Sequence, residues 1–496
     1  MAMPEKKEFF TTRWGMILSV IGIAVGTGNI WRFSRIVAQN GGGSFLIPWV
    51  VFLLLWSVPL IIAEIAIGKS TRLGTVGAIA ALAGKRFAWM GAFIGFVSTA
   101  IMFYYSVVTG WCMNYLVSSL SGTIVSTSDH VALWESFTGG TQPLLYHALA
   151  MAIGAFIVYR GVVKGIERTN RILIPMLIVI LLTLAVRAVT LPGSLQGIAY
   201  LFTPTWESLL DYRVWLAALT QNAWDTGAGW GLILTYACYA RQKEDIALNA
   251  GLTAFGNNSV SLLAGITIFS AVFALAPGDG ISELISGRGS TNTGLAFIFL
   301  PQLFQQMPGG PTAQVFFSTI FFLGLTFAAM TSLFSMIELA VKVFVDMGLG
   351  RTRAIVLVST LGFLFGIPSA LSLTFFENQD WVWGIGLMVS GGFISFAVIK
   401  HGADRFRKEA VNAEGVDFKL GRWYDVIITW IVPVQVIVLI VWWFSLAIMD
   451  YDAQGWWNPF HIYSVGTCLV QWGAMIALFM VFNRWMVART FRTRKD

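Results

Sequence analysis

The sequence predicts an all-α membrane protein, a single domain over residues 1–496 that crosses the bilayer twelve times. The composition carries this prediction: 56% of the residues are hydrophobic and 11% are charged, whereas about 25% are charged in soluble domains. Stretches of roughly 20 apolar residues, enough to cross the hydrocarbon core, recur along the chain. Glycine-rich interruptions in two of these stretches predict discontinuous helices.

Twelve segments are long and apolar enough to be membrane-spanning helices. No Pro/Ser-rich linker or low-complexity tract divides them, so one domain is expected. Their approximate limits are 14–37, 44–68, 88–119, 145–163, 170–191, 214–240, 247–275, 314–346, 353–373, 381–400, 424–448 and 462–486.

The first segment contains a glycine-rich run, Gly22 to Asn29, which we call the first interruption. Glycine has low helix propensity and freely leaves the right-handed helical region, so the helix is expected to unwind here. Broken backbone at membrane depth is tolerated only where it is buried in protein or lines a cavity. The freed carbonyls and amides must therefore face something polar, and an ion and a small polar solute are the natural candidates.

A second interruption, Asp225 to Gly231, lies five segments later. An odd number of spans inverts the topology, so residues 13–191 and 214–400 are predicted to be inverted repeats, with two appended helices in 424–486. Paired glycine-interrupted segments at matching positions of two halves are the best pointer in a sequence to a transporter's binding site.

The distribution of Lys and Arg predicts the orientation. With a cytoplasmic N-terminus, all but five of the 32 basic residues fall in cytoplasmic segments or helix ends. We therefore expect a multi-pass protein of the cell (inner or plasma) membrane with both termini cytoplasmic. The net charge of +7 reflects this polarity, and nucleic-acid binding has almost no support.

Catalytic and cofactor chemistry find little support in the residues. The three cysteines all fall within predicted spans, which gives neither a disulfide framework nor a CxxC metal site. The four histidines are scattered over loops and span ends, whereas a bis-histidine haem needs facing histidines. We expect no enzyme and no organic cofactor.

Ordered motifs between residues 13 and 404 resemble the neurotransmitter:sodium symporter family. They are RWG at 13–15, AVGTGNIWRF at 24–33, NGGGSFLIP at 40–48, Pro59 to Glu64 followed by Gly68, YYSVVTGW at 104–111, TYACY at 235–239, FGN at 255–257 and AAMTS at 328–332. Likeness to the family's bacterial leucine transporter implies the inverted-repeat architecture, a substrate site between the first, third, sixth and eighth spans, and two sodium sites.

Matching the motifs residue by residue implies the sodium ligands. Half-helix N-termini offer free N–H groups to a carboxylate, and unwound carbonyls suit a hard cation. Singly, such hydroxyls and amides more often bond their own helix or a neighbouring helix, but the ordered motifs favour ligands. The first site would use Ala24, Asn29, Asp225 and Asn257, with one oxygen of the substrate carboxylate; the second would use Gly22, Val25, Ala328, Thr331 and Ser332.

Asp225 is the most informative departure, because many members of the family carry a Ser or Thr there. A carboxylate at membrane depth is costly and indicates function. Two sodium ions and a zwitterion sum to +2, and Asp225 would lower this to +1, as chloride does in other members. Gln221 and Ser261 match chloride-site positions, but Trp49 replaces a chloride-binding tyrosine. We predict chloride-independent transport; the alternative is a core Asp225 without an ionic role.

Proton counter-transport is a further hypothesis from the same residue. Once sodium leaves, an uncompensated buried carboxylate can take up a proton. The empty carrier would then return protonated and export H⁺. A second acid, Glu64, is expected to play a structural part by bonding the unwound first span, and Glu338 is assigned no role.

Charge pairs are expected to gate the pathway. Arg32 should face an acid at the start of the tenth span; Asp380 is our choice, although ungapped spacing points nearer Asn378. On the inner side Asp346 matches the family's gate acid, and Lys7 is its expected partner. Lysine lacks arginine's bidentate fork, which predicts a looser inner gate.

The substrate is expected to be a neutral amino acid. Gly26 stands where monoamine carriers place an aspartate, so the substrate would bring its own carboxylate, to which Tyr105 would donate. The pocket is mostly apolar, which favours small or medium aliphatic side chains, then aromatic ones. The predicted lining residues are Ala24, Gly26, Gly28, Ile101, Tyr105, Trp224, Gly227, Ser332, Leu333 and Met336.

The sequence thus predicts a sodium-coupled symporter that takes up a neutral hydrophobic L-amino acid by alternating access, with Na⁺, the amino acid and the lipid bilayer as partners. The rival hypothesis is an amino-acid-binding receptor or channel-like membrane protein without concentrative transport. Uptake against a gradient separates the two.

Overall fold

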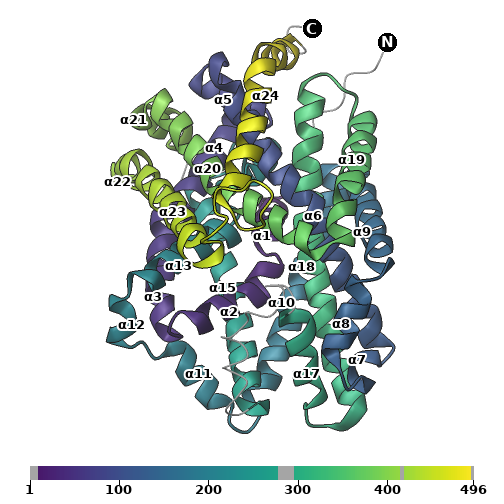
Figure 1. Ribbon diagram of the computed structural model, residues 1–496. Coiled ribbons are helices and arrows are strands. Elements are labelled where there is room, and N and C mark those ends of the chain that lie inside the picture. Colours follow the sequence, from purple (N-terminus) through teal and green to yellow (C-terminus); the bar gives the residue numbers. More distant parts are fainter. Residues whose placement is uncertain (1–8, 277–294, 414–417, 493–496) are drawn as a thin grey trace.

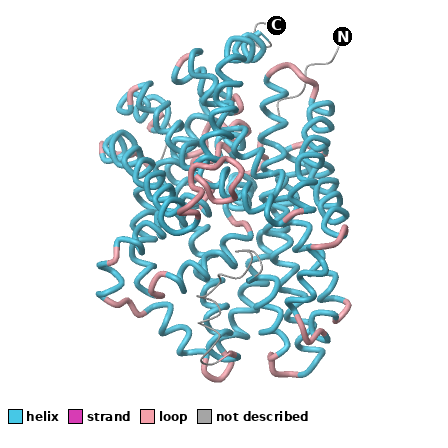
Figure 2. Tube along the Cα trace, viewed as in Figure 1, coloured by secondary structure: helices cyan, strands magenta, loops and turns pink. Residues whose placement is uncertain are grey.

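The computed structural model describes residues 9–276, 295–413 and 418–492. These residues form helices joined by turns, and within them there is no strand (Figures 1 and 2). Ten helical stretches in this part of the chain are long and apolar enough to cross a membrane. They are α3–α4 (Gly43–Thr71), α6 with the turn before it (Lys85–Leu120), α9 (Gln142–Tyr159), α10 with the turn before it (Val162–Val189), α15 (Ile246–Leu275), α18 (Gly310–Asp346), α19 (Arg351–Leu371), α20 (Leu373–His401), α22–α23 (Trp423–Tyr451) and α24 (Val465–Arg492).

Two further segments are broken. The first consists of α1 (Arg13–Ala24), a π-helical turn η1 (Gly28–Arg32) and α2 (Phe33–Gln39), and its two parts are bent by 60°. The second consists of α13 (Tyr212–Asp225) and α14 (Leu232–Ala237). Gly227, Gly229 and Gly231 between them have φ values of +69°, +89° and +77°, which side chains rarely adopt. Both interruptions therefore lie where the glycines predicted them.

Short helices connect the spans, and the sequence expectation did not include most of them. A stretch such as α5, of nine residues, is too short to cross a bilayer and lacks a span's hydropathy signal. They are α5 (Thr75–Ala83), α7 (Thr123–Ser126), α8 (His130–Thr138), α11 (Ser194–Phe202), α12 (Trp206–Leu210), α17 (Leu300–Gln305) and α21 (Ala403–Phe406).

One helix begins earlier than its predicted limit of 381. Helix α20 begins at Leu373 because the Ser372 side chain accepts a hydrogen bond of 3.2 Å from the Phe375 N–H and caps the first turn. This early start adds Asn378 and Asp380 to the helix, so both side chains have fixed directions at the outer end of the molecule's core.

Long helices α6 and α18 pack against each other at the centre of the fold. The most apolar part of α18 is 83% buried, whereas the corresponding parts of α22–α23 and α24 are 22% buried. The last two spans therefore lie at the periphery, where their apolar side chains are available to lipid. The half-helices meet inside: α13 packs against η1, and α14 packs against α1.

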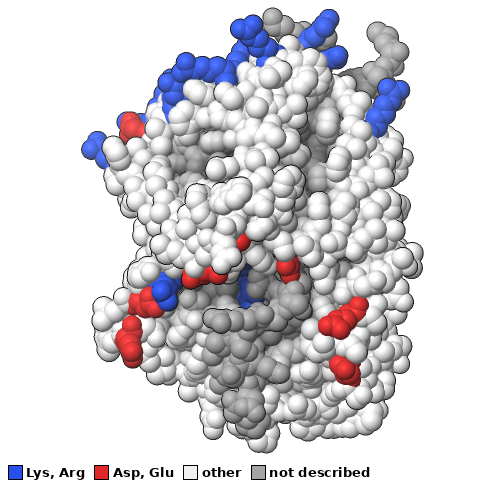
Figure 3. Space-filling view, in the orientation of Figure 1, with Lys and Arg blue, Asp and Glu red and all other residues white. Residues whose placement is uncertain are grey.

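Basic side chains gather at one end of the visible face, where α5 and the end of α24 lie (Figures 1 and 3). Most of the visible acidic side chains lie further toward the other end, together with a few basic ones, and a broad surface almost free of charge separates them from the basic end (Figure 3). This segregation is the three-dimensional counterpart of the asymmetry in the sequence.

Candidate functional site

The first interruption is held open by a short local hydrogen bond. Helix α1 ends at Ala24, and the Gly26 N–H donates to Asn29 Oδ1 over 2.8 Å instead of continuing the helix. Val25 has φ −77° and ψ +97°, an extended conformation. The backbone between Ala24 and Gly28 therefore leaves the helix, and its polar groups become available to neighbouring elements.

Amide side chains from two elements converge beside this opening. Asn29 Nδ2 donates to Asn257 Oδ1 and to Ser261 Oγ, both at 2.8 Å, and all three residues are buried. The same Asn257 amide position lies 3.2 Å from the Ala24 carbonyl oxygen and 3.1 Å from that of Asp225. The other amide position faces Asn258 Oδ1 at 3.2 Å. As an oxygen, the first position completes a cluster of oxygens; as a nitrogen, it donates to both carbonyls instead of accepting from Asn29.

Asp225 is the last residue of α13, directly before the second interruption, and is 5% exposed. Its Oδ2 accepts hydrogen bonds from Gln221 Nε2 at 3.2 Å and from Ser261 Oγ at 3.3 Å. Its Oδ1 is buried without a hydrogen-bond partner. Ser261 thus links the acid to Asn29, so the predicted first sodium site and the predicted charge-compensation residues form one cluster.

Two hydroxyl groups flank Gly26. A Cβ added at this glycine would lie 3.0 Å from the Tyr105 hydroxyl and 3.2 Å from Ser332 Oγ. The Thr27 N–H donates to the Tyr105 hydroxyl over 3.4 Å. A Cβ at Gly28 would meet no atom within 4 Å. Tyr105 is therefore positioned at the opening, and any side chain at position 26, an aspartate included, would crowd the two hydroxyls.

Among the residues predicted to bind the second sodium ion, Ser332 of α18 makes a hydrogen bond to α1. Ser332 Oγ donates to the Ile23 carbonyl over 3.3 Å, which joins the helices at the first interruption. Thr331 Oγ1 donates to the Ala328 carbonyl of its own helix over 2.9 Å. Gly22 faces α10, where a Cβ would lie 3.1 Å from Asn170 Oδ1.

The structure brings only some of the residues predicted to line the substrate side-chain pocket close to one another. Ile101, Leu333 and Met336 are buried, but Leu333 lies beside Gly154 of α9, with Cγ 3.7 Å from a Cβ built there. Gly227 lies beside the first interruption, because its Cβ would be 3.8 Å from Ala24 Cα. Trp224 carries the Arg32 guanidinium over its ring at 4.1 Å.

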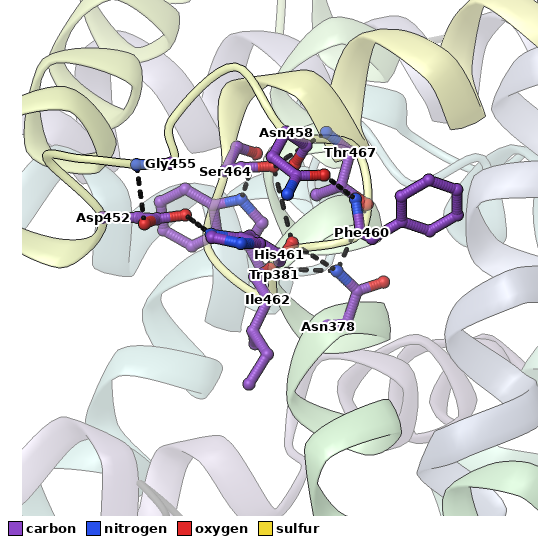
Figure 4. A network of polar contacts seen from close by, with 10 residues as sticks. All are labelled: Asn378, Trp381, Asp452, Gly455, Asn458, Phe460, His461, Ile462, Ser464 and Thr467. Atoms are coloured by element: carbon purple, nitrogen blue, oxygen red, sulfur yellow. Dashed lines mark hydrogen bonds and ion pairs between the residues drawn. The ribbon is translucent and has the colours of Figure 1, made fainter.

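Arg32 and Asp380, the predicted outer-gate pair, do not form an ion pair within 4 Å in the structure. Arg32 instead stacks on Trp224. Asn378, the other candidate, donates to the Ile462 carbonyl over 2.9 Å and to Thr467 Oγ1 over 3.2 Å (Figure 4). Asn378 therefore fastens the loop before α24, and the pairing of Arg32 with Asp380 stays a prediction.

The inner gate is described on one side only. Asp346 accepts a hydrogen bond of 2.6 Å from the Gly74 N–H and forms an ion pair with Lys342. The expected partner Lys7 lies outside the described residues. Asp346 thus joins α18 to the segment before α5.

Glu64 corrects one expectation. Its carboxylate accepts hydrogen bonds from the Gly229 N–H at 2.6 Å and the Leu234 N–H at 3.1 Å, so it bonds the second interruption rather than the first. The cause is the packing of α4 on α14, where Gly68 lies against the Leu234 backbone. The acid satisfies amides that the broken helix leaves free.

Glu338 and Ser390 were not assigned roles from the sequence. Glu338 is fully buried and binds Arg351 through both oxygens at 3.0 and 2.7 Å, and Tyr239 donates to it over 2.7 Å. Ser390 Oγ donates to the Gly229 carbonyl over 2.6 Å. An acid in an apolar span is a sequence signal that could have pointed to Glu338. A serine in a helix gives no such signal for Ser390.

Metal-binding side chains are sparse here: in the described part of the chain, no group of three or more His, Cys, Asp or Glu residues could hold a metal ion. The cluster instead offers carbonyl, amide and hydroxyl oxygens, which suit a hard cation. Two broken helices enclosing such oxygens in an all-helical bundle define the class of the protein as a polytopic membrane transporter.

Comparisons with known proteins place the chain more closely. Residues 7–136 and 131–493 match the sodium:neurotransmitter symporter family, and the chain belongs to this family. An uncharacterized sodium-dependent transporter of Methanocaldococcus jannaschii is 32% identical over 439 residues, 84% of this chain and 87% of the relative. The sodium-dependent serotonin transporter of Drosophila melanogaster is 30% identical over 91% of this chain and 79% of its own.

A solved structure resembles this one over nearly its whole length. The crystal structure of MhsT in complex with L-phenylalanine matches with a TM-score of 0.77 and 31% identity, covering 88% of this chain and 99% of that chain. The likeness confirms the family assignment and the helical transporter fold.

Proposed function

We propose that this protein is a symporter that couples the inward flow of two sodium ions to uptake of a neutral hydrophobic L-amino acid, with Asp225 in place of chloride. The chain would cross the membrane twelve times, with inverted repeats at 13–191 and 214–400, appended helices in 424–486 and cytoplasmic termini. The convergence of Asn29, Asn257 and the Ala24 carbonyl at the first interruption carries the proposal.

Sodium fits this convergence better than a hydrogen-bonded core does. The Ala24 and Asp225 carbonyls lie about the same distance from one edge of the Asn257 amide, so a cation between these oxygens would satisfy them together. The Asn29 side-chain oxygen lies at the same interruption, where it accepts from the Gly26 N–H. Ser332 at the Ile23 carbonyl supports a second cation position between α1 and α18.

The amino acid would occupy the space in front of Gly26. Its carboxylate would accept from Tyr105 and would add an oxygen to the first sodium ion, while free N–H groups at the interruption favour its negative charge. Buried Ile101 and Met336 support an apolar side chain. That MhsT was crystallised with L-phenylalanine supports a substrate of this class, including aromatic amino acids.

Uptake by purified protein in proteoliposomes tests the proposal. We expect accumulation of hydrophobic amino acids against a gradient when sodium is outside, no accumulation when potassium replaces sodium, and unchanged uptake when gluconate replaces chloride. Binding without accumulation would favour a receptor or channel-like protein, and loss of uptake in gluconate would refute the chloride-independent part. Each sodium ion entering down 100 mV contributes about 2.3 kcal/mol, so two suffice for steep accumulation.

A further inference from the structure

The face of α20 that meets the second interruption carries glycine at two points of very close approach. A Cβ added at Gly384 would lie 2.0 Å from Trp224 Cζ2 and 2.5 Å from Cη2. A Cβ added at Gly229 of the second interruption would lie 2.9 Å from Gly391 Cα. Gly384 and Gly391 are two helical turns apart and therefore share a face. At Gly384, only glycine fits while Trp224 keeps its place.

Trp224 is held between this face and Arg32. The edge of its indole lies against Gly384, and the Arg32 guanidinium lies over the ring at 4.1 Å from its centroid. Asp380, the predicted gate partner of Arg32, precedes Gly384 by one helical turn on the same face. One turn of α20 thus contacts the ring that carries the arginine, and the preceding turn presents the acid predicted to pair with it.

We propose that Gly384 is a positioning residue that sets the substrate selectivity and the geometry of the outer gate. Because Gly384 has no side chain, its backbone leaves room for a tryptophan at position 224. This inference rests on the proposed role of Trp224 as a wall of the amino-acid pocket. A Cβ at 384 would force the ring away from α20 by about 1.5 Å to restore a van der Waals contact. The displaced ring would narrow the pocket and would carry Arg32 away from Asp380.

The Gly384→Ala substitution should therefore weaken transport of large substrates more than transport of small ones. A pocket that is smaller by about one methylene discriminates by roughly 10- to 200-fold. The effect should depend on the indole, because phenylalanine at 224 lacks the Cζ2 and Cη2 atoms of the six-membered ring that would meet the new Cβ. The Gly384→Ala and Trp224→Phe substitutions should therefore be strongly non-additive.

The experiment compares wild type, Gly384→Ala, Trp224→Phe and the double variant, with Gly386→Ala as the control. Gly386 is buried on the same helix, but the nearest atom to its Cβ is 3.4 Å away, an ordinary contact. Sodium-dependent uptake of L-phenylalanine and L-alanine in proteoliposomes gives KM and kcat for each. We expect Gly384→Ala to raise KM for phenylalanine at least about tenfold and that for alanine by about threefold at most.

In the Trp224→Phe background, the same alanine substitution should leave KM within about twofold, because the pair is then uncoupled. An equal loss in both backgrounds, equal losses for both substrates, or a Gly384→Ala variant that behaves like Gly386→Ala would overturn the proposal. If Gly384→Ala alone fails to express, expression of the double variant supports the proposed contact between Gly384 and Trp224, and failure of both refutes it.

Thermal unfolding midpoints of the same purified variants separate this inference from the proposed function. The midpoints need no transport, so they test the pairing even if wild type transports no amino acid. If Gly384→Ala lowers the unfolding midpoint only when Trp224 is present, the proposed contact is supported. Additive changes in the midpoint for the two substitutions refute it.

Discussion

Asp225 is a buried acid at the second interruption whose Oδ1 has no hydrogen-bond partner among the described residues. Gln221 and Ser261 satisfy only its other oxygen, so the carboxylate retains capacity to compensate a cation. We predict that Asp225→Asn, which keeps the shape and removes the charge, weakens sodium-dependent uptake in chloride-free medium by about tenfold or more, equivalent to ~1.4 kcal/mol.

Chloride should partly restore uptake by this variant, because an external anion can then supply the missing negative charge. Uptake in chloride and in gluconate, measured over a range of sodium concentrations, gives the comparison. Gln221→Glu, which adds a carboxylate on the preceding turn, is the matched variant for charge. Equal sodium dependence of wild type and Asp225→Asn in gluconate would leave Asp225 as a purely structural acid.

At the scale of the elements, Glu64 ties α4 to the second interruption, and we call this connection the tether. Glu64 accepts from two backbone amides, Gly229 and Leu234, which the broken helix cannot satisfy itself. Glu64→Gln keeps one acceptor and turns an amide nitrogen toward the other N–H. We predict a loss of about 1–3 kcal/mol in the free energy of unfolding, seen as a lowered thermal midpoint in detergent.

Ser390→Ala is the control for the tether, since it removes a single hydrogen bond to the Gly229 carbonyl. We expect it to cost about 1 kcal/mol, less than Glu64→Gln. A Glu64→Gln midpoint equal to that of wild type would mean that water or rearranged backbone satisfies these amides.

The elements also show what the sequence could and could not predict. Both interruptions followed from glycine composition, because helix propensity is a local property. The partner of Glu64 and the stacking of Arg32 on Trp224 did not, because they depend on how helices separated by many residues are rotated against each other. A helix such as α20, whose apolar residues are spread around its whole circumference, carries little periodicity to fix that rotation.

The same reason limited the candidate site. The family motifs placed Asn29, Asn257 and Ser261 near one another, and the structure brings their side chains within hydrogen-bonding distance. The spacing around Asp380 left Asn378 as an alternative, and the structure places Asn378 against the loop before α24 (Figure 4). Leu333, expected to line the pocket, lies beside α9.

The transport cycle of the whole molecule depends on what the empty carrier takes back. If Asp225 binds a proton after sodium leaves, each cycle moves two Na⁺ in and one H⁺ out, so one net charge enters instead of two. A potential of 100 mV then contributes about 2.3 kcal/mol per cycle rather than about 4.6 kcal/mol. Internal acid favours the protonated carrier, so net uptake should speed up as internal pH falls and slow down as it rises.

Proteoliposomes loaded with a pH-sensitive dye test this coupling directly, because proton export during sodium-driven uptake must raise internal pH. We expect alkalinisation with wild type and none with Asp225→Asn in chloride medium, where uptake continues without the carboxylate. Exchange of internal for external amino acid at saturating sodium skips the return of the empty carrier and should be insensitive to internal pH. Constant internal pH during net uptake, with a voltage dependence of two charges, would show that the carrier returns without a proton.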